Sequence, residues 1–392
     1  MTDPVQAVRL PNPYVYYAEL VERRPFAFEP ELRLWAAADA ATVTEVLEHP
    51  GLRVRPADQP VPPGIAGTPA GEVFGSLVRM TDGRLQQRLK GAIVETLGAV
   101  EPARVAEFAA ARARARLSEG GPAPLEALMF SVPAEVVAAL CGLDPNAGEQ
   151  AARLAGEFVR CLPASAGPED HRSAAQAAAG LLELLGPRFD APDAGLLGDL
   201  VSAASRHGWT ETAPLLANAV GFLSQTYEAT AGLIGNTLMA FRRGAAERVP
   251  AGRLSAVVRE VARYDAPVQN TRRFAAAEVT IGGRPVQAGA AILVVLAAAN
   301  RDPAVNPDPE RFLTDRRKPA VFTFGLGAHA CPGERLATAI AAAVVGELLD
   351  VGFDPAGLPE EPGYRPSPNA RIPVLTDPAP ADPTPTDPTI AA

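Results

Sequence analysis

The sequence is poor in cysteine, in long apolar runs and in positive charge, and each shortage argues against a class of protein. Its 392 residues include only three cysteines, Cys141, Cys161 and Cys331, which are too few and too scattered for a disulfide framework and suit a reducing cytoplasm. No uninterrupted apolar stretch reaches membrane-spanning length, and the first residues lack a basic segment followed by an apolar run. The formal net charge of -9 at pH 7 argues against general nucleic-acid binding. We therefore expect a soluble globular protein of the cytoplasm, with no membrane anchor and no nucleic-acid partner.

The most informative stretch is 324–333, where a cysteine stands in a glycine-rich loop. It reads Phe-Gly-Leu-Gly-Ala-His-Ala-Cys-Pro-Gly and leads into an apolar segment, 336–349, that predicts a helix. Glycines let the backbone approach a flat, bulky group and adopt conformations that other residues resist. A helix that begins just after Cys331 directs its free N–H groups towards the sulfur, which favours thiolate, a strong donor to iron. Taken alone, Cys331 is as readily a buried small hydrophobic residue.

Four other segments accompany this loop in a recognisable order, at 80–90, 215–243, 260–263 and 299–312. With the pattern Phe-x-x-Gly-x-x-x-Cys-x-Gly, they closely resemble the cytochrome P-450 haem-thiolate monooxygenases of the soluble bacterial type, and the resemblance runs from about Pro11 to Leu375. It implies a single, mainly α domain over 1–375 with small β-sheets, in which haem lies between a long distal helix and the loop of the cysteine ligand. Residues 376–392 repeat Asp-Pro and Thr-Pro and predict a disordered tail.

The resemblance gives the loop residues haem-binding roles. In the family the cysteine is the axial ligand of the iron of haem b, which implies that Cys331 is the metal ligand. Phe324, Gly325 and Gly333 belong to the same haem-binding loop, and His329 matches a histidine that binds a haem propionate.

Further propionate-binding positions lie outside the loop. Gln86 stands where the family commonly has a histidine, and Lys90 where it has an arginine. Both side chains still donate hydrogen bonds to a carboxylate, although Lys90 offers a point charge and no planar fork. The alternatives are a solvated basic helix face, or docking of an acidic redox partner by Lys90 with Arg84 and Arg88. Arg273 matches another propionate-binding arginine, with a charge at a strand edge as the alternative.

The predicted helix 215–243 departs from the family pattern. It carries a polar patch in apolar surroundings, and buried polar side chains need partners or a function. Glu228 matches the family's acid, but the alcohol that helps to deliver protons during oxygen activation is replaced by Ala229, and a small residue facing the haem by Gln225. Thr230 points about 100° away from Ala229 unless the helix bulges locally. Three accounts stay open: the substrate supplies a hydroxyl, Gln225 holds a water, or the chemistry does not need the usual O–O cleavage.

The implied reaction is oxidation of a small organic substrate, by hydroxylation, epoxidation or a related step, as in the tailoring of bacterial secondary metabolites. Because the sequence has no flavin or nicotinamide fingerprint, electrons should come from a ferredoxin and its reductase. The substrate is free or bound to a carrier protein. The alternatives are a peroxide-driven, coupling or rearranging haem-thiolate oxidase and, in another class, a non-catalytic haem-binding auxiliary protein.

Three expectations concern structure around the site. Two segments rich in proline and glycine, 53–75 and 163–171, predict loops, and the resemblance implies that both cover the substrate channel. Glu260 and Arg263, three apart on one helix face, can form a charge pair, which alone is usually a surface pair; the resemblance implies a buried structural pair. A short strand hairpin is expected after Gly352.

Overall fold

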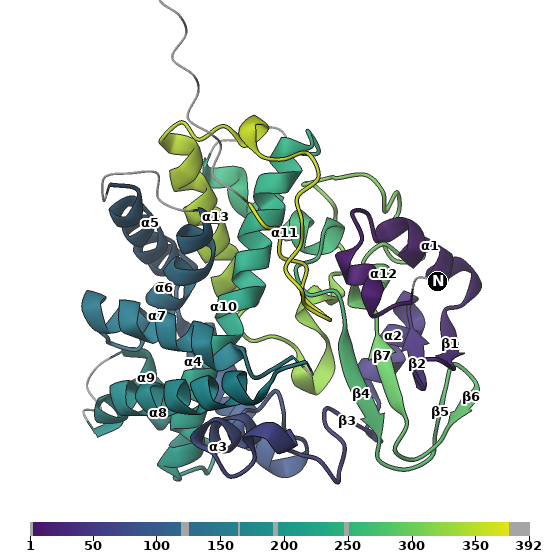
Figure 1. Cartoon of the computed structure of the whole chain (residues 1–392), viewed down its shortest axis with the longest axis horizontal. Helices are drawn as coiled ribbons and strands as arrows, with labels where there is room; N and C mark the ends of the chain where they lie inside the picture. The colour runs from purple at the N-terminus through teal and green to yellow at the C-terminus, as the bar shows by residue number, and fades with distance from the viewer. Residues whose placement is uncertain (1–2, 119–124, 164, 191–194, 247–250, 376–392) are drawn as a thin grey trace, which may run out of the picture.

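A helical part and a smaller sheet part lie side by side in the protein, with the helices on the left and the sheet on the right in Figure 1. The computed structural model describes residues 3–118, 125–163, 165–190, 195–246 and 251–375, and the predicted disordered tail, 376–392, lies outside them. Mostly helical structure with small sheets confirms the predicted fold class. Within the described ranges, no helix is both long and apolar enough to span a membrane.

The α-helices are distributed along the chain, and those from α3 to α11 follow one another between two groups of strands. They are α1 (Tyr14–Arg23), α2 (Ala40–Glu48), α3 (Pro69–Ser76), α4 (Gly83–Ala99), α5 (Pro102–Ser118), α6 (Val132–Leu140), α7 (Pro145–Val159), α8 (Pro168–Asp190), α9 (Gly195–Arg206), α10 (Thr212–Arg242), α11 (Leu254–Tyr264), α12 (Leu296–Ala299) and α13 (Glu334–Asp350). The strands are β1 (Phe26–Glu29), β2 (Leu34–Ala37), β3 (Leu52–Arg53), β4 (Thr271–Ala275), β5 (Val279–Ile281), β6 (Arg284–Val286) and β7 (Ala291–Val294).

The larger sheet joins the beginning of the chain to its last third. Its strand order is β1-β2-β7-β4-β3, with β2 and β7 parallel and the other neighbours antiparallel. Trp35 lies opposite Ile292 in the parallel pair, and Arg273 lies opposite Ile292 in the antiparallel pair. Arg273 is therefore buried on β4, next to the central strand β7 of this sheet. The smaller sheet is the β5–β6 hairpin, whose turn uses positive φ at Gly282 and Gly283.

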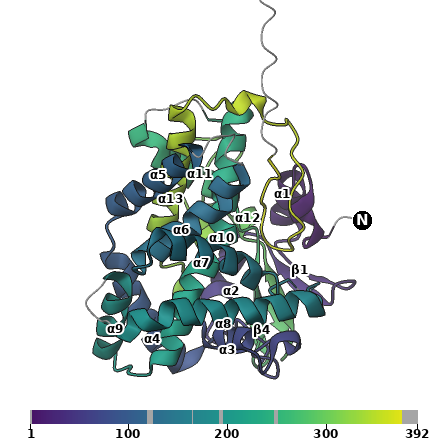
Figure 2. The same cartoon turned by 60° about the vertical axis from the view of Figure 1, so that its left-hand side comes forward.

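The long helix α10 is the axis of the helical part. It packs against α3, α6, α7, α8, α11 and α13, and Figure 2 shows α8 crossing in front of its lower half. Its apolar residues are buried on several sides, as expected for a helix enclosed by others. The helix is α-helical without interruption from Thr212 to Arg242, so no bulge turns Thr230 towards the face of Ala229. Thr230 is instead buried in the packing.

The segment 53–75 contains more helix than the sequence analysis predicted. Pro63–Ile65 forms a 3₁₀ turn, and α3 begins at Pro69. The side chain of Thr68 accepts a hydrogen bond from the N–H of Gly71, and proline suits the first helical position because its missing N–H has no partner there. This N-cap outweighs the local abundance of proline and glycine.

Two other boundaries also differ from expectation. The loop at 163–171 is shorter than predicted, because α8 already begins at Pro168 and includes His171. After Gly352 the expected hairpin is reduced to isolated bridges, of Tyr364 with Pro373 and of Val268 with Ala370. Prolines in this segment remove the N–H donors that a regular strand ladder needs.

Candidate functional site

The cysteine loop joins the sheet part to α13, and its backbone is held by its own hydrogen bonds. The N–H of Cys331 donates to the carbonyl of Phe324 at 2.7 Å, and the N–H of Gly325 donates to Phe322 at 2.7 Å. Gly325 and Gly327 have φ of 67° and 63°, a region that residues with a Cβ rarely adopt. The glycines at these two positions thus fold the loop back so that Cys331 stands directly before α13.

The side chain of Cys331 is accessible to solvent but closely surrounded by protein. Burial by that protein is the largest influence on its thiol and raises its pKa. The N–H of Gly333 and the charge of Lys90 oppose that rise. The backbone N–H before α13 therefore lowers the pKa of the Cys331 thiol, as predicted for a helix start, but desolvation raises that pKa by more. Coordination to a metal ion removes the thiol proton outright.

Gln86 and Lys90 reach the cysteine loop from α4. The amide of Gln86 donates to the carbonyl of Ala328 at 3.1 Å, and the ammonium of Lys90 donates to the carbonyl of Ala330 at 2.6 Å. Burial lowers the pKa of Lys90, which is opposed by attraction to Cys331. Gln86 is buried and Lys90 half-buried, so neither belongs to a solvated basic face.

His329 and Arg273 bring two more donors to the same side of the site. The Nε2 of His329 lies 3.1 Å from the Oδ1 of Asp82, whereas its Nδ1 is buried and has no hydrogen-bond partner among the described residues. Burial lowers the pKa of Arg273 to about 10, with the Asp82 carboxylate opposing. A buried nitrogen without a partner and a strongly desolvated guanidinium are both costly unless a ligand satisfies them.

Behind the loop, Glu260 and Arg263 form a fully buried charge pair, as the sequence analysis interpreted them. Their side chains are joined by two hydrogen bonds of 2.6 and 3.0 Å. Arg263 also donates to the carbonyls of Asn300, Pro309 and Arg311. The Asn300 amide group then accepts from the N–H of Phe322 and donates to the Thr323 hydroxyl. The pair thus fixes the segment that leads into the cysteine loop.

Three of the predicted site residues on α10 share a partly exposed face. Gln225, Glu228 and Ala229 are all of intermediate exposure, at spacings of three and four that place them on one side of the helix. The amide nitrogen of Gln225 donates to the carbonyl of Gly221 at 2.9 Å, so this side chain folds back along its own helix. Burial raises the pKa of Glu228, while Arg365 and Arg79 lower it.

Arg79 and Arg365 are two site residues that the sequence analysis did not identify. Arg365 forms an ion pair with Glu126 and lies 4.1 Å from the centre of the Phe130 ring. Arg79 directly precedes Met80 of the family-like segment, and that position was the only signal available for it. Nothing in the sequence near Arg365 indicates a role, because its neighbours come from distant parts of the chain.

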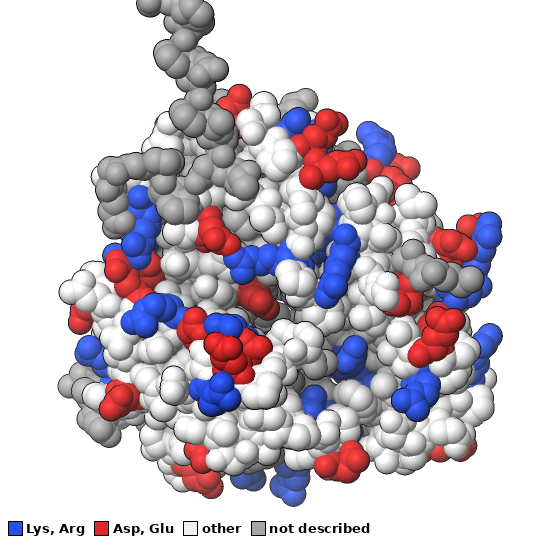
Figure 3. All heavy atoms as spheres, in the orientation of Figure 1, with Lys and Arg blue, Asp and Glu red and all other residues white. Residues whose placement is uncertain are grey.

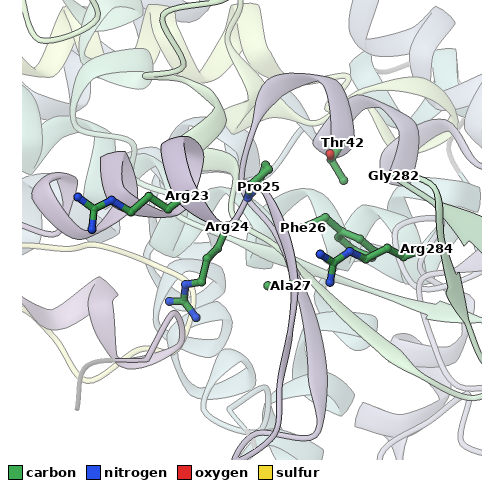
Figure 4. Close-up of a pocket in the computed structure, with 8 residues that line it drawn as sticks. All are labelled: Arg23, Arg24, Pro25, Phe26, Ala27, Thr42, Gly282 and Arg284. Atoms are coloured by element: carbon green, nitrogen blue, oxygen red, sulfur yellow. The ribbon is translucent and has the colours of Figure 1, made fainter.

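A cleft that none of these residues lines lies at the sheet part. It has a volume of about 400 Å³ and lies between β1 and the β5–β6 turn, and Figure 4 shows Arg284 beside the ring of Phe26, with Arg23 and Arg24 farther away. All three arginines are exposed, and Arg24 is already paired with Glu29. Charges of both signs are interspersed over the face in Figure 3, without a large patch of one sign. We assign no function to this cleft.

Comparison with known proteins agrees with the geometry around Cys331. Residues 253–351, which include Glu260, Arg263 and the cysteine loop, match the family model named Cytochrome P450. Residues 253–351 thus belong to the cytochrome P450 family. It is 36% identical over 160 residues to 20-oxo-5-O-mycaminosyltylactone 23-monooxygenase of Streptomyces fradiae, covering 40% of this chain and 38% of that protein. It is 32% identical over 211 residues to 6-deoxyerythronolide B hydroxylase of Saccharopolyspora erythraea, covering 53% and 52%.

The matched segments thus span about two fifths to half of the length of these relatives. Solved structures extend the likeness in fold to nearly the whole chain. The structure of CalO2 has a TM-score of 0.79 at 23% identity, covering 96% of this chain and 97% of that one. P450BioI in complex with hexadec-9Z-enoic acid ligated acyl carrier protein has a TM-score of 0.76 at 20% identity, covering 93% and 97%.

Members of the P450 family bind haem b through a cysteine thiolate, and the residues of this site fit that group. Cys331 supplies an accessible sulfur, and Gly325 and Gly327 keep the loop backbone free of side chains at its bends. The partnerless Nδ1 of His329 and the desolvated cations Lys90 and Arg273 suit the two carboxylates of a haem.

Proposed function

We propose that this protein is a haem-thiolate monooxygenase that oxidises a small organic molecule, as an enzyme that tailors a bacterial secondary metabolite. The observation that carries the proposal is the accessible Cys331, held in a glycine-bent loop and surrounded by carboxylate-binding donors. The names of the two relatives, a tylactone monooxygenase and an erythronolide hydroxylase, support the substrate class. When bound, haem supplies the chemistry: activation of dioxygen with two electrons, and transfer of one oxygen atom to the substrate.

The chain's own residues hold the cofactor and shape its surroundings. Cys331 would supply the sulfur that binds the haem iron, and Gln86, Lys90, Arg273 and His329 would bind the haem carboxylates. The pair Glu260–Arg263 holds the loop from behind, which is a structural role. On the opposite side, α10 presents Gln225, Glu228 and Ala229 towards the substrate.

Proton delivery differs from the usual family arrangement because Ala229 has no hydroxyl. One N–H of the Gln225 amide already donates to the Gly221 carbonyl, which folds this side chain back along its own helix and leaves one N–H and the oxygen for other partners. Thr230 is buried on another side of a regular helix. These two facts favour the account in which a hydroxyl of the substrate takes the place of the missing alcohol. Glu228, whose pKa is raised by burial, is the proposed acid that exchanges protons with solvent.

We also propose a ferredoxin and its reductase as electron donors. The cytoplasm is the proposed location, which the few cysteines suit, and the net charge of -9 argues against a nucleic-acid partner. Whether the substrate is free or carried by a protein is an outcome of the first experiment. The purified holoprotein is reduced under carbon monoxide, and its ferric form is titrated with candidate metabolites, free and carrier-bound. We expect the thiolate-type carbon monoxide spectrum and a low-to-high spin shift with a ligand that bears a hydroxyl group. A spectrum without the thiolate signature would instead support a non-catalytic auxiliary protein.

Replacing Ala229 by threonine tests the account of proton delivery. A restored general-acid group is worth about 100-fold or more where one is missing. With a substrate that supplies its own hydroxyl, we expect Ala229→Thr to give no gain in product formed per electron consumed, and Ala229→Val, which has the same shape without the hydroxyl, to behave alike. A large gain in the threonine variant alone would show that the substrate does not provide this group. Full activity with hydrogen peroxide and no redox partner would favour the peroxide-driven alternative.

A further inference from the structure

Arg79 stands in the chain between an anchor on the distal helix and an anchor on the cysteine loop, and its side chain has no partner among the described residues. The backbone before it is clamped to α10 by Asn218, whose Nδ2 donates to the carbonyl of Ser76 at 2.8 Å and whose Oδ1 accepts from the N–H of Val78 at 3.0 Å. Leu77 packs so closely on Gly221 that a Cβ there would lie 2.7 Å from the Leu77 Cδ2. Asn218 and Gly221 precede Gln225 and Ala229 by whole helical turns, so the clamp sits on the same face of α10.

The backbone after Arg79 is tied to the opposite side of the site. Asp82 accepts from the N–H of Val54 at 3.0 Å and pairs with His329 of the cysteine loop at 3.1 Å. Arg79 therefore follows one anchor, Val78, by one residue and precedes the other, Asp82, by three residues. Both anchors use buried or half-buried groups, so they restrict where the side chain of Arg79 can project.

Charged groups of both the cysteine loop and α10 act on the guanidinium of Arg79. The side chain is exposed, but nearby protein lowers its pKa, and Cys331 and Glu228 oppose that change. Among the described residues, no hydrogen bond or ion pair engages it. The other cations near the loop differ, because Lys90 donates to Ala330 and Arg273 donates to the carbonyl of Arg272. Of these three, only Arg79 is influenced by a residue of α10.

The guanidinium of Arg79 is accessible and has no partner among the described residues, and its planar fork matches a carboxylate in two hydrogen bonds. We propose that Arg79 is a specificity-determining residue that binds a carboxylate of the substrate on the α10 side of the site. The inference rests on the proposed function, since it assumes that haem occupies the cysteine side. Glu228 competes with the substrate for Arg79. Its carboxylate attracts Arg79 when no substrate is bound, and a substrate carboxylate replaces it as the partner of Arg79. The proposed substrate class is an organic acid with an apolar body.

The test uses ligands whose binding to the iron does not depend on the unidentified substrate. The ferric holoprotein is titrated with ω-(imidazol-1-yl)alkanoates of several chain lengths and with the matching 1-alkylimidazoles, which lack the carboxylate. Charge-assisted hydrogen bonds are worth about 1.5–3 kcal/mol, which corresponds to a factor of about 10 to 150 in affinity. We expect at least one acid to bind the wild type tighter than its neutral partner by such a factor. Arg79→Met should remove that preference without weakening the neutral ligands.

Two further variants and a control separate the outcomes. Arg79→Lys should keep part of the preference, and Glu228→Gln should increase it, because the competing carboxylate is gone. Arg23→Met, which removes an exposed arginine of the distant cleft, should change nothing. The haem-to-protein ratio is measured for each variant. Loss of haem from Arg79→Met would show that Arg79 binds a carboxylate of the cofactor and would overturn the proposal, as would equal preference in wild type and variant. A wild type without a thiolate-type spectrum would contradict the proposed function itself.

Discussion

Cys331→Ser should abolish the thiolate-type carbon monoxide spectrum and reduce monooxygenase turnover by more than about 100-fold. Changes to partners of metal ligands typically cost 10–100-fold, and this substitution removes the proposed ligand itself. A serine hydroxyl has nearly the same shape but is a far weaker donor to iron than a thiolate. The fold should survive, because the loop backbone is held by the hydrogen bonds of Cys331 N–H and Gly325 N–H, which serine keeps. The measurement is the reduced carbon monoxide spectrum together with turnover on the substrate that gives a spin shift.

The other two cysteines provide matched controls. Burial raises the pKa of Cys141 to about 12 and that of Cys161 to about 11, so neither forms much thiolate near neutral pH. Cys141→Ala and Cys161→Ala should therefore retain the spectrum of the wild type. If Cys331→Ser also retained it, the ligand assignment would be wrong.

Replacing Arg263 by methionine should have the largest effect on stability. Arg263 is fully buried, and its removal leaves the Glu260 carboxylate in the interior with Arg316, at 3.1 Å, as its one charged partner among the described residues. Breaking a buried pair in this way costs about 3–5 kcal/mol of unfolding free energy. It also frees the carbonyls of Asn300, Pro309 and Arg311, which position the segment before the cysteine loop. We expect a protein with little bound haem and a much lower denaturation midpoint.

An exposed pair with the same spacing serves as the control. Glu157 and Arg160 are also three residues apart, at 3.1 Å, but both side chains are more than 40% exposed. Exposed ion pairs contribute about 0–1 kcal/mol, so Arg160→Met should leave both the haem content and the midpoint nearly unchanged. Similar losses in the two variants would contradict the structural role assigned to Glu260–Arg263. The free energies come from urea unfolding of both variants beside the wild type.

Several elements could be predicted from local sequence because local forces determine them. The long proline-free run predicted α10 within three residues of its observed ends, at 215–243 against Thr212–Arg242. The boundaries of 53–75 were predicted less well, because the Thr68 cap forms a helix within a segment whose composition predicts a loop. The hairpin expected after Gly352 is reduced to a bridge between Tyr364 and Pro373, because the prolines of this segment lack the N–H donors of a longer ladder.

The sequence by itself predicted the chemistry of the site: a cysteine between glycines before a helix and, from the resemblance, an alanine where the family has an alcohol on the distal helix. Those features depend on residue type and spacing, which are written in the chain. Only the tertiary structure decided which charges share one interior. Arg79, Glu228 and Arg365 are separated by more than 100 residues in sequence, yet the clamp of Asn218 and the return of the C-terminal segment bring their charges within mutual influence. Electrostatic coupling depends on distance and desolvation in space, and neither can be read from sequence order.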